Sequence, residues 1–113
     1  MSCIFCKILS GEAPASIIYR DEQVMAFRDI HPIAHTHILI IPKRHIASVN
    51  DLEPGDEALV GHMLMVAKAL AAQEEVAENG YRLMINTGAH GGQTVPHLHL
   101  HLIAGRLARF LVG

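Results

Sequence analysis

The alternation of apolar and polar positions predicts a chain of short strands and two helices. Four short apolar runs predict strands, at residues 17–20, 24–28, 37–41 and 81–86. The first two runs are separated by a tight polar turn at Asp21-Glu22, which is typical of a β-hairpin. Residues 3–9 predict a short helix that ends at Gly11, and residues 46–49 predict a short helical turn.

The longest apolar segment predicts a helix over residues 54–78. Pro54 suits the first turn of a helix, and Asn79-Gly80 is a typical C-terminal signal. Between residues 59 and 72 only one histidine and one lysine are strongly polar. A helix that is apolar nearly all round is buried on more than one side, and one small sheet covers only one side. We therefore expect a homodimer through helix 54–78; the alternative is a helix rich in alanine and methionine that tolerates exposure.

Residues 97–103 alternate histidine with aliphatic residues, which is the period of a β-strand. Side chains two apart on a strand share a face, so His97, His99 and His101 line up on one side. The leucines between them point the other way, into a core. Imidazoles titrate near neutral pH and act as nucleophiles, bases or metal ligands, so this segment is the candidate centre for chemistry.

The order of elements is helix, strands, helix, strands, with hairpin-length links where strands adjoin. This order favours an α+β fold with an antiparallel five-stranded sheet, one long helix and one or two short helices. We expect the sheet to extend across the homodimer. The chain is long enough for one domain, residues 1–113.

The composition limits the partners of the protein. Half of the 113 residues are hydrophobic and 18% are charged, which is typical of a folded globular protein. Lys and Arg are few and scattered, and aromatic residues make up only 4% of the chain, so we expect no nucleic-acid partner. We find no signal peptide and no segment that spans a bilayer, and we therefore expect a cytoplasmic protein without membrane contact.

A glycine-rich segment leads directly into the histidines. Glycines let backbone N–H groups approach a phosphate closely, and Gln93 and Thr94 add side-chain donors. A phosphate held there would lie against the first part of the histidine row. One neutral imidazole is a competent nucleophile at phosphorus, and a second one beside it stabilises the charge of the transition state.

This combination resembles the histidine triad (HIT) family. Residues 97–103 are similar to the family signature, Gly91-Gly92-Gln93-Thr94 resembles its phosphate loop, and residues 27–30 and 36–43 resemble its earlier blocks. The similarity is closest to the branch of small dimeric nucleoside-phosphoramidate hydrolases. The resemblance implies a hydrolase that releases a purine nucleoside monophosphate through a covalent nucleotidyl-histidine intermediate. It also implies that catalysis requires no metal or other cofactor.

The resemblance implies a role for each matching residue. His99 matches the nucleophile, His101 the partner that bonds the phosphate, and His37 a histidine that supports them. Thr94 matches the hydroxyl near the leaving group, and Asp29 the carboxylate that accepts from the ribose hydroxyls. The remaining matches are the phosphate contacts Asn86, Gly92 and Gln93 and the apolar base slot formed by Ile17, Phe27, Ile30 and Leu39.

The Cys3-x-x-Cys6 pair has two interpretations. Residues three apart on a helix share a face, so both thiolates can hold one zinc ion, and two more ligands would complete a tetrahedron. The resemblance implies that a structural zinc would take His45 and His97 as those ligands. The alternative is that both cysteines are small buried hydrophobic residues.

Three other functions remain alternatives to the phosphoramidate hydrolase. The first is hydrolysis of dinucleoside polyphosphates at the same site. The second is a regulatory module that binds nucleotide or zinc with little turnover. The third is a metal site on the histidine row itself, which predicts that a chelator abolishes activity.

Overall fold

The computed structural model describes residues 3–105, so both ends of the predicted domain 1–113 lie outside the described residues. As predicted, its centre is a five-stranded antiparallel sheet, and the strands lie in the order β1-β2-β3-β5-β4. The strands are β1 (Ile17–Arg20), β2 (Val24–Arg28), β3 (Thr36–Pro42), β4 (Arg82–Met84) and β5 (Leu100–Ala104). The helices are α1 (Ile4–Ser10), α2 (Glu57–Gln73) and two 3₁₀ turns, η1 (Val49–Asp51) and η2 (Pro54–Asp56). Within residues 3–105 we find no helix whose length and hydropathy suit it to cross a bilayer.

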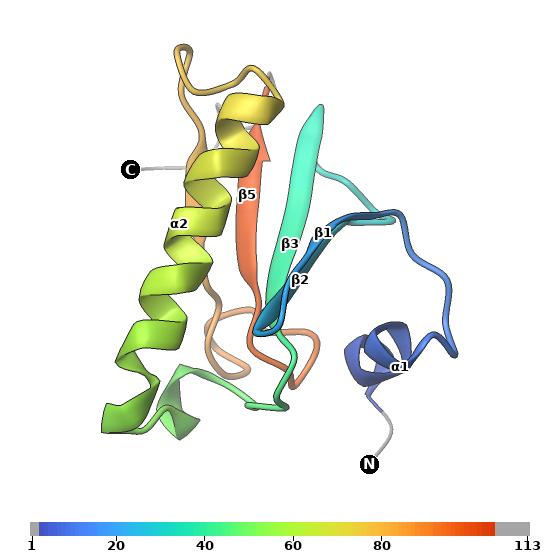
Figure 1. Ribbon diagram of the computed structural model, residues 1–113, viewed down its shortest axis with the longest axis vertical. Helices are drawn as coiled ribbons and strands as arrows, with labels where there is room; N and C mark the ends of the chain where they lie inside the picture. Colours follow the sequence, from blue (N-terminus) through green and yellow to red (C-terminus); the bar gives the residue numbers. More distant parts are fainter. Residues whose placement is uncertain (1–2, 106–113) are drawn as a thin grey trace.

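The sheet is buried on both faces, with α2 over one face and α1 beside the other (Figure 1). Along β3, Ile38 and Ile40 belong to the core under α2, whereas Leu39 and Ile41 belong to the core that contains α1. A strand with two buried faces is apolar at every position, which explains the continuous run in this strand. The histidine-bearing segment obeys the same alternation, because its three leucines lie in the core under α2.

The long helix is shorter than predicted, because it ends at Gln73 rather than near residue 78. Glu75 adopts the left-handed conformation, with φ 62°. Its N–H donates to the carbonyl oxygen of Ala72, and the N–H of Val76 donates to that of Ala71. These two bonds form a Schellman motif, and Val76 then packs against the core. The Asn79-Gly80 signal therefore falls in the following turn.

Three other boundaries also differ from the sequence prediction. The regular strand at the histidines is β5, residues 100–104, because the N–H of His97 donates to Val95 and that of Leu98 donates to Ile46. These two N–H groups therefore donate to acceptors outside the sheet, and the regular strand begins only after them. The fourth strand is limited to residues 82–84, and a helical turn expected near residues 46–49 is displaced to η1.

Candidate active site

His99 lies just before β5, and the backbone fixes the proton on its ring. Its Nδ1 lies 2.7 Å from the carbonyl oxygen of His97. A carbonyl oxygen only accepts, so Nδ1 carries the proton and donates it. In the neutral ring, Nε2 therefore keeps its lone pair. This is the protonation state that a nucleophilic imidazole needs.

A second backbone group fixes the protons on His37 and His101. The N–H of Ile33 donates to Nδ1 of His37 at 3.2 Å, so the proton of the neutral His37 ring lies on Nε2. Nε2 lies 2.9 Å from Nδ1 of His101 and donates to it. The proton of neutral His101 is then on its own Nε2, which is buried and has no hydrogen-bond partner among the described residues. The chain of hydrogen bonds from Ile33 through His37 therefore ends at His101, whose Nε2–H donor has no acceptor among the described residues.

Burial keeps this pair neutral at physiological pH. Burial, together with the neighbouring imidazoles of His99 and His37, lowers the pKa of His101 to about 4. Burial also lowers the pKa of His37, against the opposing effect of Asp29. The imidazole rings of His99 and His101 lie 4.9 Å apart between centroids. A lone pair on one ring and an N–H donor on the next are therefore neighbours.

We expect the free energy of unfolding to fall as the pH drops from about 6.5 to about 4, because His101 must become charged on unfolding. In that window the unfolded chain binds more protons than the folded one, so stability increases with pH. The lowering from 6.5 to about 4 corresponds to roughly 3 kcal/mol. Chemical denaturation of the wild type and of His101→Gln at pH 7 and pH 4 measures the effect. An equal loss of stability in both proteins would contradict it.

His99 and His101 line a pocket of about 460 Å³, a volume typical of a small-molecule site. Most of the predicted substrate-binding residues line it: Phe27, Asp29, Ile30, Leu39, Thr94, His99 and His101. Asp29 and Ile30 follow β2, whereas Thr94 precedes the histidines, so segments far apart in sequence meet here. Ile17, Asn86, Gly92 and Gln93 are not among its lining residues.

Helix α1 forms a wall of this pocket that the sequence analysis did not assign. Ile4, Phe5 and Ile8 line the pocket from one face of the helix. The ring of Phe5 meets His99 edge-on, with 5.1 Å between centroids, and it meets Phe27 at 5.4 Å. The spacing of these apolar residues on a short amphipathic helix was the available signal, but it indicates a buried face without showing what the face covers.

The glycine segment is arranged differently from the predicted phosphate cradle. The N–H groups of Gly91 and Gln93 donate to the carbonyl oxygen of Gly88, and that of Gly92 donates to Ala89. The side-chain amide of Gln93 donates to Ala47 and Val95 and accepts from the N–H of Gly88. In this arrangement these N–H groups are used within the protein. The segment instead brings Thr94 to the pocket.

A second cluster joins Cys3 and Cys6 of the α1 region to His45 and His97. The four sulfur-to-Nδ1 distances lie between 3.2 and 3.7 Å. A tetrahedral zinc ion with typical Zn–S and Zn–N bonds places such atoms about 3.6 Å apart. Nε2 of His97 donates to the carbonyl oxygen of Pro42 at 2.9 Å, which leaves Nδ1 free as a ligand. The donor set and its spacing therefore fit zinc.

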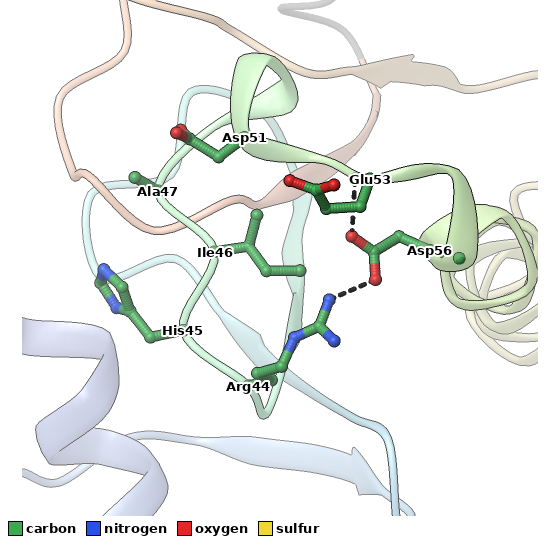
Figure 2. A pocket seen from close by; sticks show the side chains of 8 residues that line it. Arg44, His45, Ile46, Ala47, Asp51, Glu53 and Asp56 are labelled. Atoms are coloured by element: carbon green, nitrogen blue, oxygen red, sulfur yellow. Dashed lines mark hydrogen bonds and ion pairs between the residues drawn. The ribbon is translucent and has the colours of Figure 1, made fainter.

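The loop that carries His45 is anchored from its other side. An open hollow of about 610 Å³ adjoins this loop. Arg44, which lines the hollow, forms an ion pair with Asp56 (Figure 2). Asp56 also accepts the N–H of Glu53 at 2.9 Å. The imidazole of His45 points away from this ion pair (Figure 2). These bonds hold the loop in place independently of the cysteines.

Asp29, His37 and His101 also bring potential metal-ligand atoms within 4.8 Å of one another. However, the N–H of Ile33 donates to Nδ1 of His37, so Nε2 of the neutral ring carries a proton and has no lone pair for a metal. The two clusters therefore differ in kind. The cysteine cluster presents lone pairs, whereas the aspartate cluster is a hydrogen-bonded chain.

Residues 10–108 match the HIT domain family. The chain is 53% identical over 103 residues to the purine nucleoside phosphoramidase of Escherichia coli strain K12, covering 91% of this chain and 87% of that protein. It is also 53% identical over 103 residues to an uncharacterized HIT-like protein of Synechococcus elongatus, covering 91% of this chain and 90% of that one. The crystal structure of a HIT family hydrolase from Legionella pneumophila superposes with a TM-score of 0.91 at 51% identity, covering 93% and 94% of the two chains.

Proposed function

The chain belongs to the HIT domain family, and from this premise we propose that it hydrolyses purine nucleoside phosphoramidates to nucleoside monophosphates. The observation that carries the proposal is the pairing of a lone pair on Nε2 of His99 with the N–H donor of His101 at the wall of one pocket. The pocket also holds a carboxylate at Asp29 and apolar residues from β2, β3 and α1. These groups suit a phosphate, a ribose and a base.

The first step forms a bond between Nε2 of His99 and the α-phosphorus, while the bond from phosphorus to the leaving nitrogen breaks. The amine leaves with the bonding electron pair and takes up a proton from solvent, which reaches the pocket beside the exposed Thr94. The N–H of His101 donates to a phosphoryl oxygen, where negative charge develops. In the second step the oxygen of water bonds to phosphorus, and the bond from phosphorus to Nε2 of His99 breaks with its electron pair returning to Nε2. The attacking water gives up a proton to solvent, and the monophosphate leaves with the neutral imidazole restored.

A steady-state assay with adenosine phosphoramidate and with a dinucleoside polyphosphate tests this proposal. We expect the phosphoramidate to have the higher kcat/KM. Preference for the polyphosphate would favour the alternative hydrolase. Nucleotide binding without turnover of either compound would favour a regulatory module.

We further propose that Cys3, Cys6, His45 and His97 bind one structural zinc ion, because their spacing and lone pairs fit it. The ion would hold α1 against the sheet and would take no part in the chemical steps. This arrangement needs free thiols, which a reducing compartment maintains, so we propose that the protein works in the cytoplasm.

We also propose a homodimer through the outer face of α2. Leu64 is 45% exposed and Met65 is 61% exposed, although both are large apolar side chains. His62 bonds Asp21 beside β1 and β2, and Leu64 lies about 160° away around the helix axis, toward the β4 edge. Leu64 and the edge strand β4 are therefore on the same side of α2, and Met65 lies about 100° from Leu64 around the axis, on the face turned away from the sheet. Pairing of two such edges would extend the sheet across the dimer.

The double substitution Leu64→Lys with Met65→Lys is expected to convert the dimer to monomers, because it places two charges in an apolar contact. Sedimentation at micromolar concentration measures the change. Gln73→Lys, which adds a charge at an exposed position on another side of α2, is the matched control. A monomeric wild type, or a double variant that stays dimeric, would contradict the proposed interface.

A further inference from the structure

Asp29 lines the pocket, and its carboxylate also lies beside the hydrogen-bonded pair His37 and His101. Its Oδ1 accepts the N–H of His31 at 2.9 Å, which fixes the side chain. Its Oδ2 lies 3.4 Å from Nε2 of His37. The N–H of Asp29 donates to the carbonyl oxygen of His37 at 3.0 Å, so backbone and side chain both hold the two residues together.

His37 therefore presents one proton to two acceptors. Nδ1 of His101 is the nearer acceptor at 2.9 Å, and Oδ2 of Asp29 is the second at 3.4 Å. Both imidazoles are largely buried, and interactions between charges and hydrogen-bonded rings are strong away from water. A change of charge at Asp29 consequently alters the orientation and polarisation of the ring whose free N–H reaches the phosphate.

We propose that Asp29 is a positioning residue for the catalytic histidines, acting through His37 on His101, in addition to its contact with the ribose. The inference rests on the proposed function, since it concerns the same phosphate-binding imidazole. It links recognition of the sugar at one end of the pocket to the chemistry at the other. A carboxylate that only binds ribose would affect substrate affinity and nothing else.

The test compares the wild type with Asp29→Asn, which keeps an oxygen acceptor for the N–H of His31 and removes the charge. Each protein is assayed with adenosine phosphoramidate and with its 2′,3′-dideoxy analogue, which has no hydroxyl for Asp29 to bind. We expect Asp29→Asn to lower kcat by about tenfold on both substrates, a magnitude typical of groups that orient a functional histidine. The loss stays moderate because Ile33, rather than Asp29, fixes the proton position on His37. Asp51→Asn, at an exposed aspartate outside the pocket, is the matched control.

Equal kcat values for the wild type and Asp29→Asn on the dideoxy substrate would overturn the proposal. A second readout needs no turnover: nuclear magnetic resonance titration of the free protein. The carboxylate raises the pKa of both His37 and His101, against burial and against the imidazole of His99, to which the imidazole of His37 adds in the case of His101. Asp29→Asn should therefore lower both values, and unchanged ring-nitrogen titrations would also overturn the proposal. Failure of the proposed function itself appears differently, as a wild type that does not hydrolyse the phosphoramidate.

Discussion

Replacing His99 with alanine is expected to reduce kcat by about 10⁶-fold, because loss of the nucleophile removes both steps of a covalent mechanism. The other groups of the pocket remain, so affinity for a nucleoside monophosphate should change little. The edge of Phe5 packs against His99, and alanine leaves only a small cavity beside it. Steady-state kinetics and calorimetric titration with adenosine monophosphate measure the two quantities separately.

The matched control for this variant is His90→Ala, which removes an exposed imidazole outside the pocket. Its kcat should equal that of the wild type. A His99→Ala protein that folds normally and loses only a fewfold in kcat would contradict the assignment.

Loss of the proposed zinc ion is expected to have the second-largest effect, which is on thermal stability. Cys3→Ser should release the zinc and lower the midpoint of thermal unfolding by about 10 °C, corresponding to roughly 3 kcal/mol in a domain of this size. Helix α1 has only seven residues, too few to be stable without tertiary contacts. Because this helix forms a wall of the pocket, KM should rise more than kcat falls.

The choice of serine separates the metal from the helix cap. Sγ of Cys3 accepts the N–H of Cys6 at 3.1 Å as the N-cap of α1, and a serine hydroxyl can make the same bond. Lys7→Ala, at an exposed position of the same helix, is the control that leaves all four ligands in place. Elemental analysis should find one zinc per wild-type chain and none in Cys3→Ser. Wild-type protein purified without chelator and free of metal would contradict the site.

Local patterns were sufficient to predict most of the fold. The bounds of β1 and β2 agree with the sequence prediction, since a polar turn between two short apolar runs is a local signal. The alternation from His97 to Leu102 predicted which side chains enter the core, because the period of a strand depends only on the backbone. The five-stranded antiparallel α+β architecture followed from these elements in order.

Long-range contacts determine what the sequence analysis missed. Helix α2 ends early because Val76 packs on the core, and this contact outweighs the Asn79-Gly80 signal. The side-chain amide of Gln93 donates to the carbonyl oxygen of Ala47, 46 residues away in sequence. It therefore stabilises the loop and is not free to bind a ligand. The proton positions on the catalytic rings depend on backbone groups only two and four residues away, but they are set by the orientation of those groups, which the order of residue types does not specify.

The most direct test of the account is to stop the reaction with adenosine phosphoramidate during the first turnover and to analyse the protein by mass spectrometry. The account predicts a transient adduct of one adenylyl group, located by fragmentation at His99 and absent from His99→Ala. An adduct at a different residue, or release of adenosine monophosphate in a single turnover without any adduct, would contradict it.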